Sequence, residues 1–128
     1  MTRPRALACG LWLALSLAPC LAATPTAGEQ RLRAAIEADQ PHAIALLERL
    51  VNQNSGSLNL AGVKAVGDMV RAELEPLGFE VEWIDMRATG RAGHLVATHR
   101  GNGRGKRVLM IGHLDTVFEP DSPFQRFE

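Results

Sequence analysis

Residues Val108-Leu109-Met110-Ile111-Gly112-His113-Leu114-Asp115-Thr116 join a short apolar run to an imidazole and a carboxylate. Such a run after a Gly-rich turn is typical of a strand that is buried on both faces of a sheet. Because side chains alternate along a strand, His113 and Asp115 are predicted to point the same way at its carboxyl end, where ligands bind in open α/β sheets. A carboxylate that accepts one imidazole N–H leaves the other nitrogen for a metal ion. The alternative is a hydrogen-bonded His at the end of a strand and an Asp that begins a turn.

The periodicity of the remaining chain predicts an α/β fold in which helices precede the strands. The expected elements are helices over 29–39, 41–51 and 60–74, a loop over 52–59, strands over 79–85 and 94–100, and a Gly-rich turn over 101–105. Pro41 is expected to begin the second helix, and Pro76 and Gly78 to end the third. Glu80 and Glu82 alternate with apolar residues and predict the solvated face of a strand.

The first 22 residues have the pattern of a secretory signal peptide. Arg3 and Arg5 precede a Leu/Ala-rich core, and small residues precede a cleavage position after Ala22. We therefore expect residues 1–22 to be a leader, residues 23–128 to be the mature chain, and the product to be periplasmic or secreted. The alternative is a lipoprotein in which Cys20 carries the lipid.

Removal of this leader restricts the chemistry of the mature chain. Both cysteines, Cys9 and Cys20, leave with it, so a metal site must use His, Asp and Glu, which suits a catalytic zinc ion. The mature chain keeps 12 basic and 14 acidic residues, has no basic stripe and has no aromatic ladder. We therefore expect no nucleic-acid partner and, after cleavage, no membrane association.

Other motifs in the chain favour structural roles. Residues 101–106 (Gly-Asn-Gly-Arg-Gly-Lys) lack the ending of a phosphate loop and are expected to form a hairpin turn. His94 and His99 are five residues apart in a strand, so they face opposite ways and cannot chelate one ion. His113 and Asp115 remain, but a catalytic zinc takes three protein ligands, so on these residues alone the site is incomplete.

The segment Gly112-His113-Leu114-Asp115-Thr116-Val117 resembles the signature of the di-zinc metallopeptidase and amidohydrolase family. That family includes glutamate carboxypeptidase, aminoacylase, acetylornithine deacetylase and succinyl-diaminopimelate desuccinylase. Four further segments look most like its secreted glutamate carboxypeptidase branch: Gln40-Pro41, Leu50-Val51-Asn52, residues 72–81 and Pro123-Phe124.

The resemblance implies a role for each residue of the motif. His113 would be a zinc ligand, and Asp115 the active-site acid that clamps this imidazole. It also implies two zinc ions in the complete site, with the remaining ligands and the catalytic Glu beyond Glu128. The expected fold is the N-terminal part of a zinc-exopeptidase catalytic domain, with helices packed on a mixed sheet that is incomplete at the C-terminus. The family's dimerisation domain is also absent, so a homodimer is expected only of a full-length form.

These implications lead to three hypotheses about function. The first is a zinc-dependent carboxypeptidase that hydrolyses small peptides or N-acyl amino acids, with glutamate as a candidate released residue. The second is an N-acyl amino-acid deacylase on the same fold, and the third is a non-catalytic binding module. We expect the 128-residue chain alone to be inactive and prone to aggregation.

Overall fold

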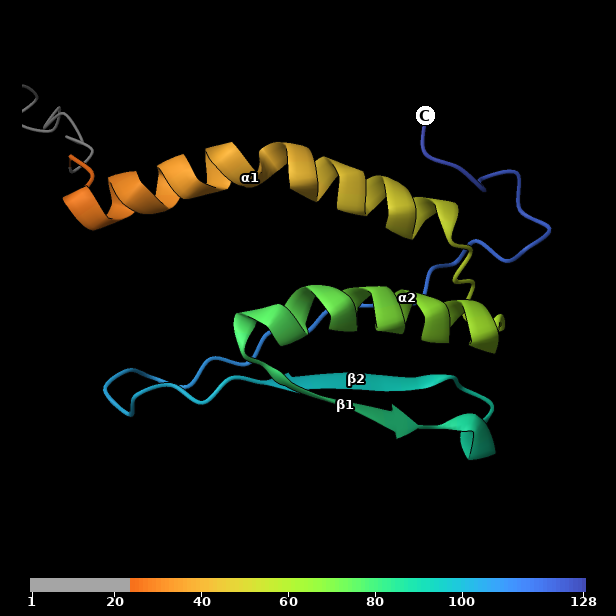
Figure 1. The fold of residues 1–128 in the computed structure, drawn as a ribbon. Coiled ribbons are helices and arrows are strands. Elements are labelled where there is room, and N and C mark those ends of the chain that lie inside the picture. Colours follow the sequence, from red (N-terminus) through yellow and green to blue (C-terminus); the bar gives the residue numbers. More distant parts are fainter. Residues whose placement is uncertain (1–23) are drawn as a thin grey trace, which may run out of the picture. The chain divides into compact units, whose positions relative to one another are not determined.

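The computed structural model describes residues 24–128, so the expected leader over 1–22 lies outside the described residues. Its elements in chain order are α1 (Ala27–Asn52), α2 (Leu60–Leu74), the short 3-10 helix η1 (Glu75–Leu77), β1 (Glu80–Asp85), the 3-10 helix η2 (Arg87–Thr89) and β2 (Gly93–Thr98) (Figure 1). The chain divides into two compact units, the first ending at Ala38 and the second beginning at Asp39. Within residues 24–128, no helix combines the length and the hydropathy needed to cross a membrane.

Helix α1 is continuous where two helices were expected. It begins with a capping box, in which the Thr26 hydroxyl accepts from the Glu29 N–H (3.2 Å) and the Glu29 carboxylate accepts from the Thr26 N–H (2.6 Å). Pro41 lies inside the helix instead of beginning a new one, so that prediction is wrong. Proline lacks one N–H and removes one bond of the ladder, and here the bonds on either side keep the helix intact.

In the second unit, α2 lies along a two-stranded antiparallel sheet (Figure 1). Strand β1 pairs with β2 from Glu80 opposite Thr98 to Asp85 opposite Gly93. The buried apolar core is small and consists of Val63, Val66 and Ala92. The predictions for α2, for both strands and for the exposed Glu80 and Glu82 are confirmed within a residue or two.

The indole of Trp83 fixes the packing of α2 on the sheet. A Cβ atom added to Gly67 of α2 would come within 2.7 Å of the Trp83 ring, and one added to Gly93 of β2 would also meet that ring at 2.7 Å. Gly93 also has a φ of 151°, which L side chains rarely adopt. The Trp83 ring therefore fits because two glycines from different elements leave space for it.

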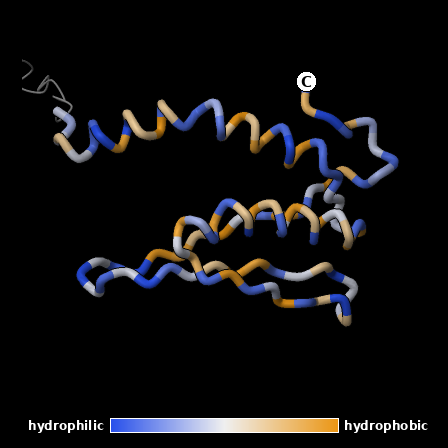
Figure 2. The backbone as a smooth tube through the Cα atoms, in the orientation of Figure 1, coloured by the Kyte–Doolittle hydropathy of each residue, from blue (hydrophilic) through white to orange (hydrophobic). Residues whose placement is uncertain are grey.

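The expected buried strand over 108–111 does not form. Val108, Leu109, Met110 and Ile111 are 81–88% exposed, and none of them belongs to a strand. Figure 2 shows this segment as a hydrophobic stretch on the chain that returns from the Gly-rich loop. A buried strand needs a hydrogen-bonded neighbour and cover on both faces, and within residues 24–128 this segment has neither.

Two further expectations fail because residues 108–111 form no strand. Residues 101–105 form an exposed loop and not a hairpin turn, because no strand follows them in the described chain. The sheet over residues 24–128 is antiparallel and not mixed. The coarser prediction, helices with strands in an α/β arrangement, agrees with the structure.

The contact between Gly67 and Trp83 predicts an unusual effect of an alanine substitution. Gly→Ala inside a helix normally stabilises it by about 1 kcal/mol, but Gly67→Ala forces the rigid Trp83 ring to move and should destabilise the chain by about 1–3 kcal/mol. Denaturant titration measures the change. Gly101→Ala, which meets open space, is the control and should be nearly neutral. A gain in stability for Gly67→Ala would contradict the packing described here.

The exposed run 108–111 predicts self-association of the 128-residue chain. Replacing Leu109 and Ile111 with Lys should raise its soluble fraction without changing its circular dichroism, because both side chains lie in solvent. Leu95→Lys is the contrasting variant and should unfold the sheet, because Leu95 is half-buried opposite Trp83. If aggregation measured by light scattering is unchanged in the double Lys variant, this run is not its cause.

Candidate functional site

Two segments about sixty residues apart in the sequence pair to build the candidate site. We call this contact the clasp, made by residues 54–58 and 115–119. Gly56 and Thr116 form a parallel bridge, with Thr116 N–H donating to the Ser55 carbonyl (2.9 Å) and Ser57 N–H donating to the Thr116 carbonyl (3.1 Å). The backbones are so close at this point that a Cβ on Gly56 would lie 2.7 Å from the Glu119 Cα.

Side chains extend the clasp on both sides of the bridge. The Asn54 amide donates to the Phe118 carbonyl (2.9 Å), and the Leu58 N–H donates to the Glu119 carboxylate (3.0 Å). Asn59 holds the loop to α2, because its side chain accepts from the Gly62 N–H (3.1 Å) as the N-cap and donates to the Asn54 side chain (2.9 Å). The clasp is therefore tied to the start of α2.

The clasp places His113 and Asp115 side by side. His113 Nδ1 lies 3.0 Å from Asp115 Oδ1, so the expected proximity of the two side chains is confirmed, although the strand from which it was inferred is absent. Between them, Leu114 lies toward α2, and a Cβ on Gly67 would come within 3.5 Å of its Cδ1. The His113 side chain is 88% exposed, whereas that of Asp115 is 38% exposed.

Ser57 is the third member of this group, and the sequence analysis did not single it out. Its hydroxyl donates to Asp115 Oδ2 over 2.5 Å and also lies 3.3 Å from the Thr116 carbonyl. The only available signal was its place in the polar loop 52–59, which says nothing about a partner 58 residues away. The pairing is visible only in the folded chain.

The electrostatics of the group keep Asp115 ionised. The Ser57 hydroxyl, first, and the His113 imidazole, second, lower the pKa of Asp115 below its usual range, while slight burial acts weakly in the opposite direction. An ionised carboxylate can only accept hydrogen bonds, so His113 Nδ1 carries the proton in this contact. The Nε2 lone pair is then left for a Lewis acid.

These residues fit one part of a zinc site. Over residues 24–128, no group of three or more His, Cys, Asp or Glu side chains is arranged to hold a metal ion. His113 can supply one nitrogen ligand, and Asp115 provides the outer hydrogen bond that ligating histidines usually make. The donor chemistry suits zinc, but a complete site needs further ligands.

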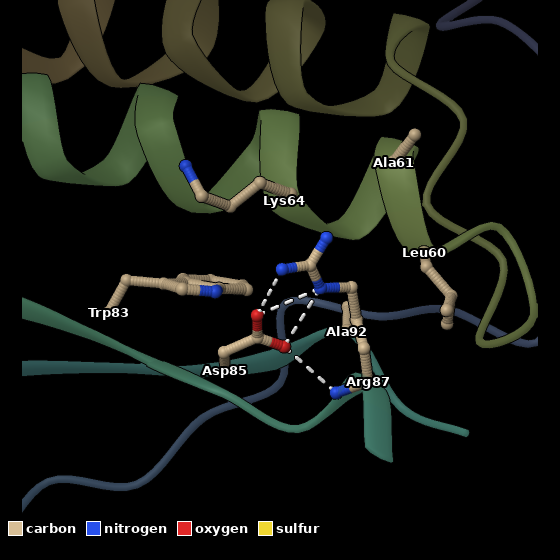
Figure 3. A pocket seen from close by; sticks show the side chains of 7 residues that line it. All are labelled: Leu60, Ala61, Lys64, Trp83, Asp85, Arg87 and Ala92. Carbon is tan, nitrogen blue, oxygen red and sulfur yellow. Dashed lines mark hydrogen bonds and ion pairs between the residues drawn. The ribbon is translucent and has the colours of Figure 1, made fainter. Parts of the chain in front are cut away.

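A separate cavity of about 440 Å³ lies between α2 and the sheet (Figure 3). Its lining residues are Leu60, Ala61, Lys64, Trp83, Asp85, Arg87 and Ala92. Lys64 Nζ lies 5.2 Å from the centre of the Trp83 ring, and Arg87 pairs with Asp85. The Arg87 side chain and backbone lower the pKa of Asp85. The lining of the cavity includes neither His113 nor Asp115, so the cavity is distinct from the candidate site.

Sequence comparisons relate the chain to hydrolases. No family model matches it, and no solved structure matches it. It is 36% identical over 80 residues to carboxypeptidase G2 of Pseudomonas sp. (strain RS-16). The aligned region covers 62% of this chain and 19% of that protein. It is 33% identical over 85 residues to succinyl-diaminopimelate desuccinylase of Leptothrix cholodnii (strain ATCC 51168 / LMG 8142 / SP-6). That aligned region covers 66% of this chain and 21% of that protein.

The chain thus spans about a fifth of the length of these two relatives. One is a carboxypeptidase and the other a desuccinylase, and both similarities support a relationship to the peptidase and amidohydrolase family that the His113 motif resembles.

Proposed function

We propose that the protein is a zinc-dependent hydrolase that cleaves the amide bond of a small peptide or an N-acyl amino acid. The observation that carries this proposal is the 3.0 Å contact between His113 Nδ1 and Asp115 Oδ1, which directs the proton to Nδ1 and leaves Nε2 as a ligand. His113 would hold zinc, and Asp115 would orient His113. Because a catalytic zinc takes three protein ligands, the proposed site requires further ligands from outside residues 24–128.

The described residues would act by holding Asp115 in place and by orienting the His113 imidazole. Asp115, kept ionised by Ser57, accepts a hydrogen bond from His113 Nδ1–H and leaves Nε2 as the nitrogen that would bind zinc. The clasp limits the positions that Asp115 can take. A bound zinc ion would supply Lewis-acid polarisation of the scissile carbonyl. In the family that the motif resembles, two such ions and a catalytic Glu complete the site.

For the substrate, we propose carboxypeptidase-type release of a C-terminal residue, with glutamate as the first candidate. The similarity to a carboxypeptidase and the resemblance to the secreted glutamate carboxypeptidase branch support this choice. The second candidate is deacylation of an N-acyl amino acid, which the similarity to a desuccinylase favours. Parallel assays of the complete gene product on peptides ending in Glu and on N-succinyl amino acids separate the two.

We further propose that the protein is exported. Export is supported by the leader pattern of residues 1–22, including Arg3, Arg5 and the small residues before Ala23. Mass spectrometry of the periplasmic or secreted product should give an N-terminus at Ala23 or Thr24. An intact Met1 chain in the cytoplasm would contradict export, and a lipid on Cys20 would assign the chain to a membrane surface.

Substitutions at the motif test the proposed chemistry in the complete gene product. His113→Ala should remove zinc from one position and nearly all hydrolysis. Asp115→Asn should keep the fold but lower zinc affinity or activity by about 10–100-fold, since it weakens the orientation of His113. His94→Ala, an exposed histidine on β2, is the control for nonspecific loss of an imidazole. Unchanged zinc content and unchanged rate in His113→Ala would refute the proposal.

A further inference from the structure

The Ser57 hydroxyl makes the closest side-chain contact to Asp115 in the described structure. It lies 2.5 Å from Oδ2, while the His113 imidazole lies 3.0 Å from Oδ1, so the two oxygens of one carboxylate have different partners. Ser57 also lies 3.3 Å from the Thr116 carbonyl, but a hydroxyl has one proton, and the shorter distance to an ionised acceptor favours Asp115. The chain of contacts therefore runs from Ser57 through Asp115 to His113.

We propose that Ser57 is a positioning residue that sets the orientation of the Asp115 carboxylate and, through it, the tautomer and direction of His113. This inference rests on the proposed function for its consequence at zinc, but its structural part concerns only the three side chains. Ser57 does not touch a reacting group and acts through Asp115.

The backbone gives Ser57 the rigidity that this role needs. Its own N–H donates to the Thr116 carbonyl, one residue after Asp115, so hydroxyl and carboxylate are carried by two paired backbone segments. A carboxylate can otherwise rotate about its last torsion, which is a broad, two-fold rotor. With Oδ2 held by Ser57, Oδ1 is left facing Nδ1. This bond matters because His113 is 88% exposed and has little packing to orient its ring.

Loss of the Ser57 hydroxyl should therefore change the tautomer and orientation of His113 and leave the fold intact. In Ser57→Ala the clasp keeps its backbone bonds, which do not involve the side chain. The Asp115 carboxylate gains rotational freedom, and its hydrogen bond no longer favours the Nδ1–H tautomer of His113. Zinc affinity should fall by about tenfold, the lower end of the range for outer hydrogen-bond partners of a metal ligand.

The experiment compares three variants of the complete gene product. Ser57→Ala removes the hydroxyl, and Ser57→Thr keeps it. Ser55→Ala makes the same chemical change in the same loop and retains the carbonyl that accepts from Thr116. The first readout is the tautomer of His113 in metal-free protein labelled with 15N-histidine, assigned by comparison with His113→Ala. The second is zinc retained against a competing chelator, and the third is kcat and KM measured separately.

The expected result is a shift of His113 away from the Nδ1–H form and about tenfold weaker zinc retention in Ser57→Ala, with kcat reduced more than KM. Ser57→Thr and Ser55→Ala should match the wild type. A folded Ser57→Ala protein with an unchanged His113 tautomer would overturn the inference, as would an equal loss in Ser55→Ala. If the wild type binds no zinc, the proposed function fails, while the tautomer in metal-free protein still decides the role of Ser57.

Discussion

The candidate site depends on the short parallel pairing of Gly56 with Thr116. This contact closes a loop of about sixty residues and brings Ser57 next to Asp115. The entropic cost of closing this loop is offset by hydrogen bonds of the Asn54 amide and of the Glu119 carboxylate. The hydrogen bond from Asn59, the N-cap of α2, to Asn54 offsets it further. Without it, the exposed chain that carries His113 would have little to fix its position.

The position of the clasp explains why His113 and Asp115 meet although the strand before them is absent. The apolar residues 108–111 and Gly112 are exposed, and a Cβ added to Gly112 would meet open space. After them, Leu114 lies toward α2 near Gly67, and Thr116 pairs with the loop. The acid of the motif is thus held from its C-terminal side, and the imidazole is held through the acid.

Sequence patterns were sufficient where the deciding forces are local. The apolar period of α2 and the alternation of β1 depend on neighbours within a few residues, and so does the end of α2 shortly before Pro76 and Gly78. These features were predicted. Pro41 was mispredicted because the helical hydrogen bonds on either side of it keep α1 continuous, and residues 108–111 were mispredicted because strand pairing depends on a distant neighbour. The proximity of His113 and Asp115 was predicted from their spacing, whereas Ser57 was missed because its partner is distant in the sequence.

The clasp holds residues 115–119 in place, while residues 108–112 remain open to solvent. Amide hydrogen exchange of the 128-residue chain, carrying Leu109→Lys and Ile111→Lys for solubility, tests it most directly. We expect measurable protection of the Thr116 and Ser57 N–H groups, which donate within the clasp, and rapid exchange of the amides over 108–112. If the Thr116 and Ser57 amides exchange as fast as those over 108–112, the clasp does not form in solution and does not hold His113 and Asp115 in place.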